Sequence, residues 1–399
     1  MLTFLFLFCL SDGQQFSTGN TLPLVGMPWG FNHWSPQTRM NGGSWWFNGN
    51  DHSFFWIRCT HQPSPWIGDY GWFLLGPQVG SPMPSEHFWE PRGSVIKPHL
   101  FDATLAPWGI RLELAPTVHG SIVRVTFPAA SQQRYMCFAE AEWSLREPTK
   151  IVGVSRKVSI DKLPVVNFGL HIVITSDQPT VSVNNEAKNC FQYDSSAESV
   201  TIRISTSLIS EEFARRTMER ELPPSKGFDE LAGEAKAEWN KMLKKVDVLD
   251  AGDISEESMK HLSVFYTCLY RALTFPRRTD ELTPDGRRVH YSPYSNQGGQ
   301  HDGPGVTDNG FWDTFRTVYP LLSLLYPEFL GDIIQGWLNA FKEGGWLPSW
   351  ASPGYRNCMV GTFADVVIAD AIVKDIDGFN LVTAYEALYK GIHFITFRV

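Results

Sequence analysis

The chain has 399 residues, of which 43% are hydrophobic and 19% charged, and its formal net charge is −8. This composition is that of a globular protein of two or three domains, and an acidic chain lacks the basic surface that binds nucleic acid. The longest apolar run, residues 2–10, is far shorter than the roughly 20 residues that cross a bilayer, so no transmembrane segment is expected.

That apolar run begins the chain and is followed by Ser11, Asp12 and Gly13. An apolar segment of this length at the N-terminus is typical of a signal peptide. No Lys or Arg precedes it and no clean A-x-A cleavage site follows, so a buried strand and a mis-started reading frame are the alternatives. We expect residues 1–14 to be a signal peptide and the protein to be secreted or extracytoplasmic.

Residues 15–222 are predicted to form an antiparallel β-sandwich. Apolar residues alternate with others over 110–114, 123–127 and 200–204, and a period of two buries one face of a strand. Clusters of Pro, Gly, Asn and Asp separate these runs at short intervals, as in a sandwich. Strands do not alternate with helices, which argues against a parallel sheet.

The pattern changes to helical spacing after residue 222. A first helix is predicted from the apolar residues Leu231, Ala235, Trp239, Met242 and Val246. A second helix is expected to begin near Ser255 and to be closed by Pro276, because proline cannot continue a helix. Residues 223–279 are therefore assigned to a helical linker.

Residues 280–307 are rich in Gly, Pro and Asn and are predicted to be a long loop. Beyond them, we expect helices over 312–326, 328–343, 361–376 and 380–391. Helix hairpins in series are typical of an α/α toroid or a bundle. The predicted fold class is therefore a β-sandwich followed by a partial α/α domain over 280–399.

Cysteine usage gives no metal site. The six cysteines are widely spaced and form no C-x-x-C pair and no Cys/His cluster, so structural zinc is not expected. They are Cys9, Cys59, Cys137, Cys190, Cys268 and Cys358.

The first segment with candidate chemistry is THQPSPWIGDYG at residues 60–71. Its two prolines stiffen a polar loop around Trp66. An aromatic face held in place can stack on the C–H face of a sugar ring. The alternative is that Trp66 is a core residue beneath a turn.

The second segment is TDNGFWDTFRTVYP at residues 307–320. Asp313 and Arg316 are three residues apart, so on a helix they would share a face and could pair. A carboxylate accepts hydrogen bonds from vicinal hydroxyls and a guanidinium donates to them. The alternative is a surface salt bridge. Asp308 is interpreted as an N-cap or a loop-structuring residue.

The third segment is a Trp/Pro/Gly-rich loop over 345–354, followed by MVGT at 359–362 and ADA at 369–371. The loop leads into a helix whose N-terminus favours acceptor groups. For Asp365 and Asp370 the alternative interpretation is ordinary helix surface.

Together and in this order, these segments resemble glycoside hydrolase family 92, the calcium-dependent exo-α-mannosidases. Further matching pieces are STGN at 17–20, MPWG at 27–30 and WSPQT at 34–38, and the resemblance extends over about residues 16–389. It implies an N-terminal β-sandwich and an (α/α)6 catalytic domain, with the sugar bound at their junction. It also implies mannose-containing glycans or glycoproteins as substrates.

By this resemblance, Trp66 would line the outer sugar site and Asp313 would bind the hydroxyls of the terminal mannose. Arg316 would lie beside Asp313 or orient it, and Trp312 and Trp350 would pack around the pocket or in the core. The resemblance implies a calcium ion that holds sugar hydroxyls, with most of its ligands outside this chain. No catalytic residue and no metal ligand is assigned within residues 1–399.

The sequence departs from the family in its C-terminal part. The family's general acid is a Glu in a later G-N-E-P-type motif, its general base is an Asp further on, and neither segment occurs here. Residues 391–399 are unlike the family, and Phe363 stands where relatives often carry His. We therefore expect a C-terminally truncated chain that is inactive alone and leaves apolar faces of its helices uncovered.

Two other functions stay open at this point. One is a non-catalytic carbohydrate-binding or structural fragment, which the missing acid and base segments favour for the chain as given. The other is a different α/α-toroid hydrolase, trehalase-like or phosphorylase-like, which the THQPSPW and DNGFWDTFRT segments argue against.

Overall fold

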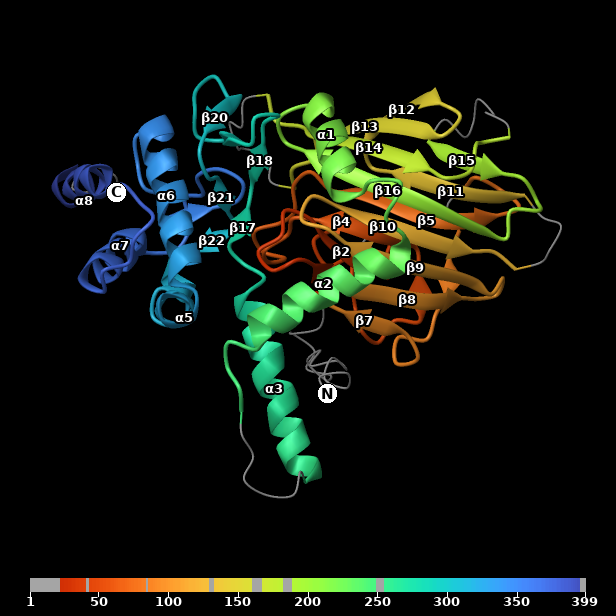
Figure 1. The fold of residues 1–399 in the computed structure, drawn as a ribbon, viewed down its shortest axis with the longest axis horizontal. Helices are drawn as coiled ribbons and strands as arrows, with labels where there is room; N and C mark the ends of the chain where they lie inside the picture. Colours follow the sequence, from red (N-terminus) through yellow and green to blue (C-terminus); the bar gives the residue numbers. More distant parts are fainter. Residues whose placement is uncertain are drawn as a thin grey trace. The chain divides into compact units, whose positions relative to one another are not determined.

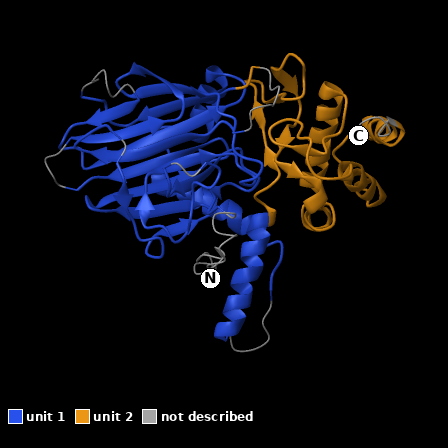
Figure 2. Cartoon of the chain, turned by 180° about the vertical axis from the view of Figure 1, so that it is seen from behind, with its two compact units in different colours: residues 1–160, 169–271 blue, residues 161–168, 272–399 orange. Residues whose placement is uncertain are grey.

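The computed structural model describes residues 22–40, 43–83, 85–128, 133–159, 167–181, 189–248 and 255–394. The chain divides into two compact units (Figure 2): unit 1 is Met1–Ile160 with Gly169–Arg271, and unit 2 is Asp161–Phe168 with Ala272–Val399. The expected signal peptide at residues 1–14 lies outside the described residues. Within them, no helix has the length and apolarity that a membrane span requires.

Unit 1 is built on two antiparallel sheets (Figure 1), with strand orders β1-β2-β4-β5-β11-β15 and β12-β13-β14-β16-β10-β9-β8-β7. Strands β3 and β6 form a separate two-stranded antiparallel sheet in the same unit. The strands are β1 (Val25–Gly26), β2 (His33–Gln37), β3 (Ser53–Phe54), β4 (Trp56–Thr60), β5 (Phe73–Val79), β6 (His87–Phe88), β7 (Val95–Lys97), β8 (Leu100–Leu105), β9 (Ile110–Pro116), β10 (Gly120–Thr126), β11 (Arg134–Ala139), β12 (Glu142–Glu147), β13 (Lys150–Ser155), β14 (Leu170–Ser176), β15 (Cys190–Tyr193) and β16 (Ser199–Ser207).

The two sheets pack face to face, as the alternation predicts. Trp34 of β2 donates its indole N–H to the carbonyl oxygen of Gly120 in β10 at 3.3 Å. Phe73 of β5 meets Trp143 of β12 edge-on, with 5.9 Å between ring centroids. The expected β-sandwich is confirmed, and its core lies between these sheets.

Helices cover the face of the eight-stranded sheet opposite the six-stranded one (Figure 1). They are α1 (Glu211–Glu221), which Ser210 caps by accepting from the Phe213 amide at 3.2 Å, and α2 (Phe228–Leu243). Helix α3 (Glu256–Ala272) follows, near the predicted start at Ser255. The cluster beneath α1 and α2 consists of Ala115, Ile122, Val152, Val173, Ala214, Met218, Leu222, Phe228 and Leu231.

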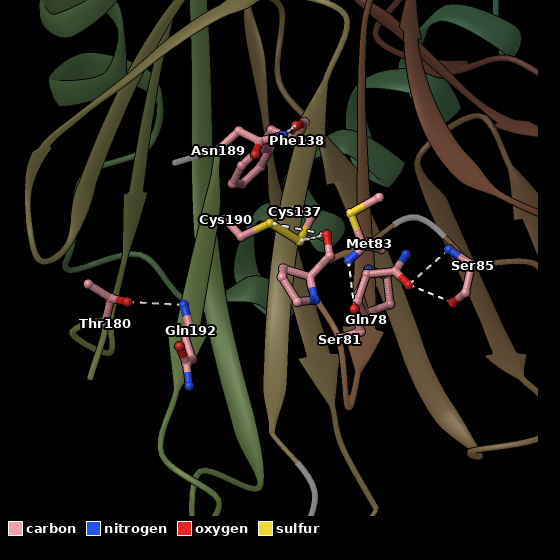
Figure 3. Close-up of a disulfide and its surroundings, with 12 residues drawn as sticks. Gln78, Ser81, Met83, Ser85, Cys137, Phe138, Thr180, Asn189, Cys190 and Gln192 are labelled. Atoms are coloured by element: carbon pink, nitrogen blue, oxygen red, sulfur yellow. Dashed lines mark hydrogen bonds between the residues drawn. A yellow bond between two sulfur atoms is a disulfide. The ribbon is translucent and has the colours of Figure 1, made fainter. Parts of the chain in front are cut away.

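A disulfide joins the adjacent strands β11 and β15 (Figure 3). Cys137 and Cys190 are cross-strand partners in the register and bond through their sulfurs. Wide spacing along the sequence, 53 residues, gave no sign of this pairing. The bond closes the long excursion between β11 and β15 and so restricts the unfolded chain.

The C-terminal end of α1 is tied to the turn between β9 and β10 by a buried ion pair. Glu221 Oε1 lies 2.7 Å from His119 Nδ1, and Glu221 Oε2 accepts the His119 backbone N–H at 3.0 Å. Burial acts to raise the pKa of Glu221, but the charge and hydrogen bonds of His119 outweigh it and lower this pKa to about 2.

This pair makes the free energy of unfolding depend on pH in the acidic range. The pKa of Glu221 is lower in the folded chain than its ordinary 4.5, so its contribution is present above pH 4.5 and is lost as the pH falls towards 2. Between pH 5 and 3 we expect Glu221 to account for a loss on the order of 2 kcal/mol in the free energy of unfolding.

Urea denaturation of the parent and of Glu221→Gln at several pH values measures this contribution. In Glu221→Gln, the free energy of unfolding should depend less on pH than in the parent. In Glu219→Gln, at an exposed residue of the same helix, more of the parent's pH dependence should remain. Equal slopes for Glu221→Gln and the parent would show that the pair does not stabilise the fold.

Unit 2 contains short strands and five helices within the described residues. The strands are β17 (Arg277–Arg278), β18 (Asp280–Leu282), β19 (Arg288–Tyr291), β20 (Gln300–Asp302), β21 (Val306–Thr307), β22 (Asn309–Gly310) and β23 (Trp350–Ala351). The helices are α4 (Phe311–Thr314), α5 (Val318–Leu325), α6 (Pro327–Gly344), α7 (Phe363–Val373) and α8 (Leu381–Phe394).

The prediction of a long loop over 280–307 is wrong. Strands β18, β19 and β20 form an antiparallel sheet there. The turn between β18 and β19 is stabilised by Thr283, whose hydroxyl lies 2.5 Å from Asp285 Oδ1, and by Gly286 with φ +83°. A left-handed φ suits glycine, so the Gly-rich composition marked hairpin turns.

The prediction of one helix over 312–326 is also wrong, because the chain turns at residues 315–317 between α4 and α5. Pro320 lies in the first turn of α5. It has no backbone N–H, and its ring would clash with the carbonyl of residue 316 if the helix were continuous. Proline is tolerated in a first turn, so a new helix begins just before it.

Large apolar side chains are exposed on α7 and α8, as expected for uncovered helix faces. Val373 is 84% exposed and Ile392 70%. The others on these two helices are Val366, Ile372, Leu381, Val382, Tyr385 and Tyr389. Where such side chains adjoin one another, they mark a contact region or an aggregation liability.

Candidate functional site

Trp66 lies in unit 1 and is 68% exposed. Its ring meets that of Trp45 edge-on, with 5.3 Å between centroids. The alternative that Trp66 is a core residue is therefore wrong. Its indole offers a largely open apolar face, the geometry that sugar stacking requires.

The loop that carries Trp66 is anchored by the buried carboxylate of Asp69. Oδ1 accepts the backbone N–H groups of His61 and Tyr70, both at 2.8 Å. Oδ2 accepts from the Thr60 hydroxyl at 2.8 Å and from Arg58 Nε at 2.9 Å. One aspartate thus ties both ends of the loop to β4, and the aromatic platform sits on a fixed base.

The other candidate residues lie in unit 2, around Asp308, which lies between β21 and β22. Asp308 there has a left-handed φ of +61°, which aspartate and asparagine tolerate better than most residues. Its Oδ2 accepts from Arg277 Nε and its Oδ1 from the Ser352 hydroxyl, each at 2.8 Å. Both side chains of the Arg277–Asp308 ion pair are fully buried. The loop-structuring interpretation of Asp308 is confirmed.

Asp313 lies on α4, immediately after this loop, and its side chain is exposed. Within the described part of the chain it forms no hydrogen bond or ion pair. Burial raises the pKa of the Cys358 thiol; the charge of Arg356 opposes this, and the Asp313 carboxylate adds to it, so Asp313 lies near Cys358. Asp313 is thus a carboxylate with acceptor capacity to spare.

Arg316 does not pair with Asp313. Its guanidinium lies over the rings of Phe315 and Trp312, 4.6 and 5.1 Å from their centroids, and Nη2 donates to the Trp312 carbonyl at 3.2 Å. The cause is the turn that separates α4 from α5, which removes the shared helix face on which pairing depends. Trp312 is 36% exposed, so its ring is partly available.

Trp350 packs beneath the loop. It lies on β23, which pairs with β22, and it is 7% exposed. A Cβ on Gly310 would lie 2.7 Å from the Trp350 ring, so glycine is needed for this contact. Of the two roles considered for Trp350, the core role is the one that its burial favours.

Phe363, at the start of α7, stacks on Phe315 with ring centroids 4.1 Å apart and planes 7° apart. Asp365 accepts from the Thr362 hydroxyl at 2.8 Å, and Asp370 pairs with Lys374 at 2.6 Å. These two aspartates are engaged with neighbours on their own helix, in line with the helix-surface interpretation.

A buried polar cluster in unit 2 was not found from the sequence. His290 Nε2 lies 3.0 Å from Glu343 Oε1, and His290 Nδ1 lies 3.0 Å from the Gly303 carbonyl. Burial acts to lower the pKa of His290, but its bond to Glu343 and the charge of that carboxylate raise it. The partners are 53 residues apart on a strand and a helix, and no local pattern joins them.

The described residues hold no group of three or more His, Cys, Asp or Glu side chains arranged to bind a metal ion. They do not by themselves fit the calcium ion that the resemblance implies.

Two family models match consecutive parts of the chain. The N-terminal domain of glycosyl hydrolase family 92 matches residues 10–207, and the catalytic domain of that family matches residues 213–394. Together they account for nearly all of the chain.

Solved structures and one curated protein are similar to the chain. An inverting mannosidase of family GH92 from Bacteroides thetaiotaomicron is 33% identical, with a TM-score of 0.84 over 94% of this chain and 53% of that one. An α-mannosidase of that organism, in complex with mannoimidazole, is 22% identical, with a TM-score of 0.77 over 95% and 54%. A protein from Arthroderma benhamiae named uncharacterized secreted glycosidase is 26% identical over 48% of this chain and 20% of its own length. The chain thus spans about half the length of these solved relatives and a fifth of the curated one.

Proposed function

Because the chain belongs to glycoside hydrolase family 92, we propose that it forms part of an inverting α-mannosidase that releases terminal α-linked mannose from glycans or glycoproteins. The observation that carries the proposal is Asp313, an exposed carboxylate that has no partner among the described residues and that follows the Asp308 loop within the matched catalytic domain. The 33% identical relative is an inverting mannosidase, which supports both the sugar and the stereochemistry.

In this proposal the chain supplies sugar-binding groups. Asp313 accepts hydrogen bonds from mannose hydroxyls, and charge-assisted bonds of this kind are stronger than neutral ones. Trp66 offers its exposed ring to the apolar face of a sugar. Arg316, held over Trp312, keeps donors free that can reach a hydroxyl oxygen.

Inversion needs two further carboxyl groups. One protonates the leaving oxygen while the other activates a water on the opposite face, with about 6.5–9.5 Å between them. We assign neither role within residues 1–399, whose sequence has no G-N-E-P-type motif. Both roles, and most of the calcium ligands, are assigned to a second half of the domain. The extended chain is defined as residues 1–390 continued into such a second half.

The mannose-binding role of Asp313 is tested in the extended chain. Asp313→Ala should lower kcat/KM for an α-mannoside about 10- to 100-fold, because a hydrogen bond to a charged group contributes roughly 1.5–3 kcal/mol. Glu328→Ala, at another exposed acidic residue of unit 2, should leave kcat/KM unchanged. An Asp313→Ala enzyme as active as the parent would remove Asp313 from the site.

We further propose a secreted or extracytoplasmic location. The Cys137–Cys190 disulfide supports it, because disulfides persist in oxidising compartments and are rare in the cytosol. The similar Arthroderma protein named as a secreted glycosidase supports it as well.

A non-catalytic carbohydrate-binding or structural role is the second candidate. The exposed ring of Trp66 would serve that role equally well. Turnover by the extended chain separates the two, since a binding protein would retain affinity for mannosides and release no mannose.

A further inference from the structure

A cavity of about 640 Å³ lies in unit 1, at the edge of the contact between α1 and the eight-stranded sheet. Residues of β13, β14 and β16 form one wall, and α1 with the connection to α2 forms the other. Its volume is within the range of small-molecule sites, about 300–1,000 Å³. None of the sugar-binding candidates lines it.

The floor of the cavity is apolar and firmly packed. Val173 of β14 and Leu222, the residue that follows α1, are each 1% exposed, while Met218 and Phe228 are 8% and 6% exposed. All four belong to the buried cluster that holds α1 and α2 on the sheet. The floor is therefore a preformed apolar layer, and Met218 and Phe228 contribute more of its accessible surface than Val173 and Leu222 do.

Above this floor, three polar side chains stand in one row across the sheet. Lys150 of β13 is the register partner of Thr175 in β14, and Thr175 is the partner of Arg203 in β16. Register partners share a face of the sheet, and neighbouring strands are about 4.8 Å apart. The Lys150 and Arg203 backbones are thus about 10 Å apart, with the Thr175 hydroxyl between them.

Neither cation in this row is held in a close ion pair, although Glu147 of β12 is the register partner of Lys150 on its other side. No ion pair joins Lys150 or Arg203 to a carboxylate in the described part of the chain. Arg203 Nη2 donates to the carbonyl oxygen of Lys226 at 2.9 Å, but its Nε is buried and has no partner among the described residues. A buried donor without an acceptor favours a ligand that brings one.

The acidic residues of the lining do not fill this role. Glu219 pairs with Arg215 on α1. Asp177 accepts the backbone N–H of Thr201 through Oδ1 at 2.8 Å. Among the lining side chains outside the Glu219–Arg215 pair, Lys150 and Arg203 stand against Asp177 alone, so the lining is net positive and an anionic head group is preferred. Phe228 is the aromatic residue of the lining, and the guanidinium of Arg124 covers one face of its ring, 4.3 Å from the centroid. That face cannot stack on a sugar, so a sugar is disfavoured.

We propose that this cavity binds an amphipathic carboxylate, whose head group lies between Lys150 and Arg203 and whose hydrocarbon part lies on the apolar floor. Such a site in the sandwich is independent of the mannosidase proposal. It accounts together for the two cations without a close ion pair, the Arg203 Nε that has no partner among the described residues, and the preformed apolar floor.

Isothermal titration calorimetry of residues 1–399 with octanoate tests the proposal, with octanamide as the uncharged probe. Octanoate should bind, and octanamide should bind at least about fivefold more weakly. Lys150→Gln and Arg203→Gln should each weaken octanoate binding by about fivefold or more, whereas the exposed Lys260→Gln should not. Equal binding of the two probes, or no binding of octanoate, would overturn the proposal.

A matched pair of glycine variants keeps the test independent of the charged residues. Gly227 lines the cavity, and a Cβ added there meets nothing within 4 Å; the same holds for Gly233, which does not line it. Gly227→Leu should therefore obstruct octanoate without strain, and Gly233→Leu should bind it as the parent does. A folded Gly227→Leu chain with the affinity of the parent would overturn the cavity as the binding site.

Discussion

Residues 1–399 alone should hydrolyse an α-mannoside at least about 10⁴-fold more slowly than the extended chain. Each missing acid or base partner costs about 10²–10⁴-fold in rate, because the leaving oxygen must depart unprotonated and the water must attack without activation. Because the acid and the base are both assigned to the second half, residues 1–399 lack both, and the two losses in rate multiply. Weak sugar contact through Trp66 or Asp313 is all that should persist.

A fluorogenic α-mannoside assay of the two proteins, at equal concentration, measures this difference. The same assay tests the calcium requirement. EDTA should abolish the activity of the extended chain, and added Ca²⁺ should restore it. Turnover by residues 1–399 that approaches the rate of the extended chain would place a catalytic pair within the residues that we regard as sugar-binding or structural.

Replacing Asp308 with Asn should destabilise unit 2 by about 3–5 kcal/mol. The substitution retains the shape of the side chain and tolerates the left-handed φ of +61°. What it removes is the charge opposite Arg277, whose side chain is fully buried. A buried guanidinium without its counter-ion is costly, and the Ser352 hydroxyl does not replace that charge.

Chemical denaturation followed by the fluorescence of the many tryptophans measures the loss. Asp302→Asn is the matched control, because Asp302 pairs with Arg287 in the same unit with side chains that are 79% and 61% exposed; its midpoint should stay at that of the parent. If Asp308→Asn unfolds at the denaturant concentration of the parent, the buried pair does not stabilise the loop that positions Asp313.

The sandwich was predictable from the sequence because its strands alternate. In β9, three residues are fully buried, Ile110, Leu112 and Leu114, whereas Arg111 is exposed. The alternation in the sequence thus predicts which face of the strand is buried. Glu113 departs from the pattern. It is buried, and it is matched by its register partner Arg124, whose Nε lies 2.8 Å away. Cross-strand pairing of this kind cannot be deduced from one strand.

The candidate site was predictable only where local chemistry determined it. The prolines around Trp66 signalled a stiff loop, and Asp308 was interpreted as an N-cap or loop-structuring residue, of which the structure shows the second. The partner of Asp308 is Arg277, 31 residues away, and the disulfide of Cys137 spans 53 residues. Such pairings depend on how strands are brought together, which local spacing does not encode.

The anomer that the extended chain releases first tests the mannosidase account most directly. Proton NMR of an α-mannoside digest, recorded before mutarotation mixes the anomers, distinguishes the two outcomes. Direct attack of water on the face opposite the leaving group predicts that β-mannose appears first. Initial release of α-mannose would contradict the account, because retention requires a covalent intermediate and a different pair of carboxylates.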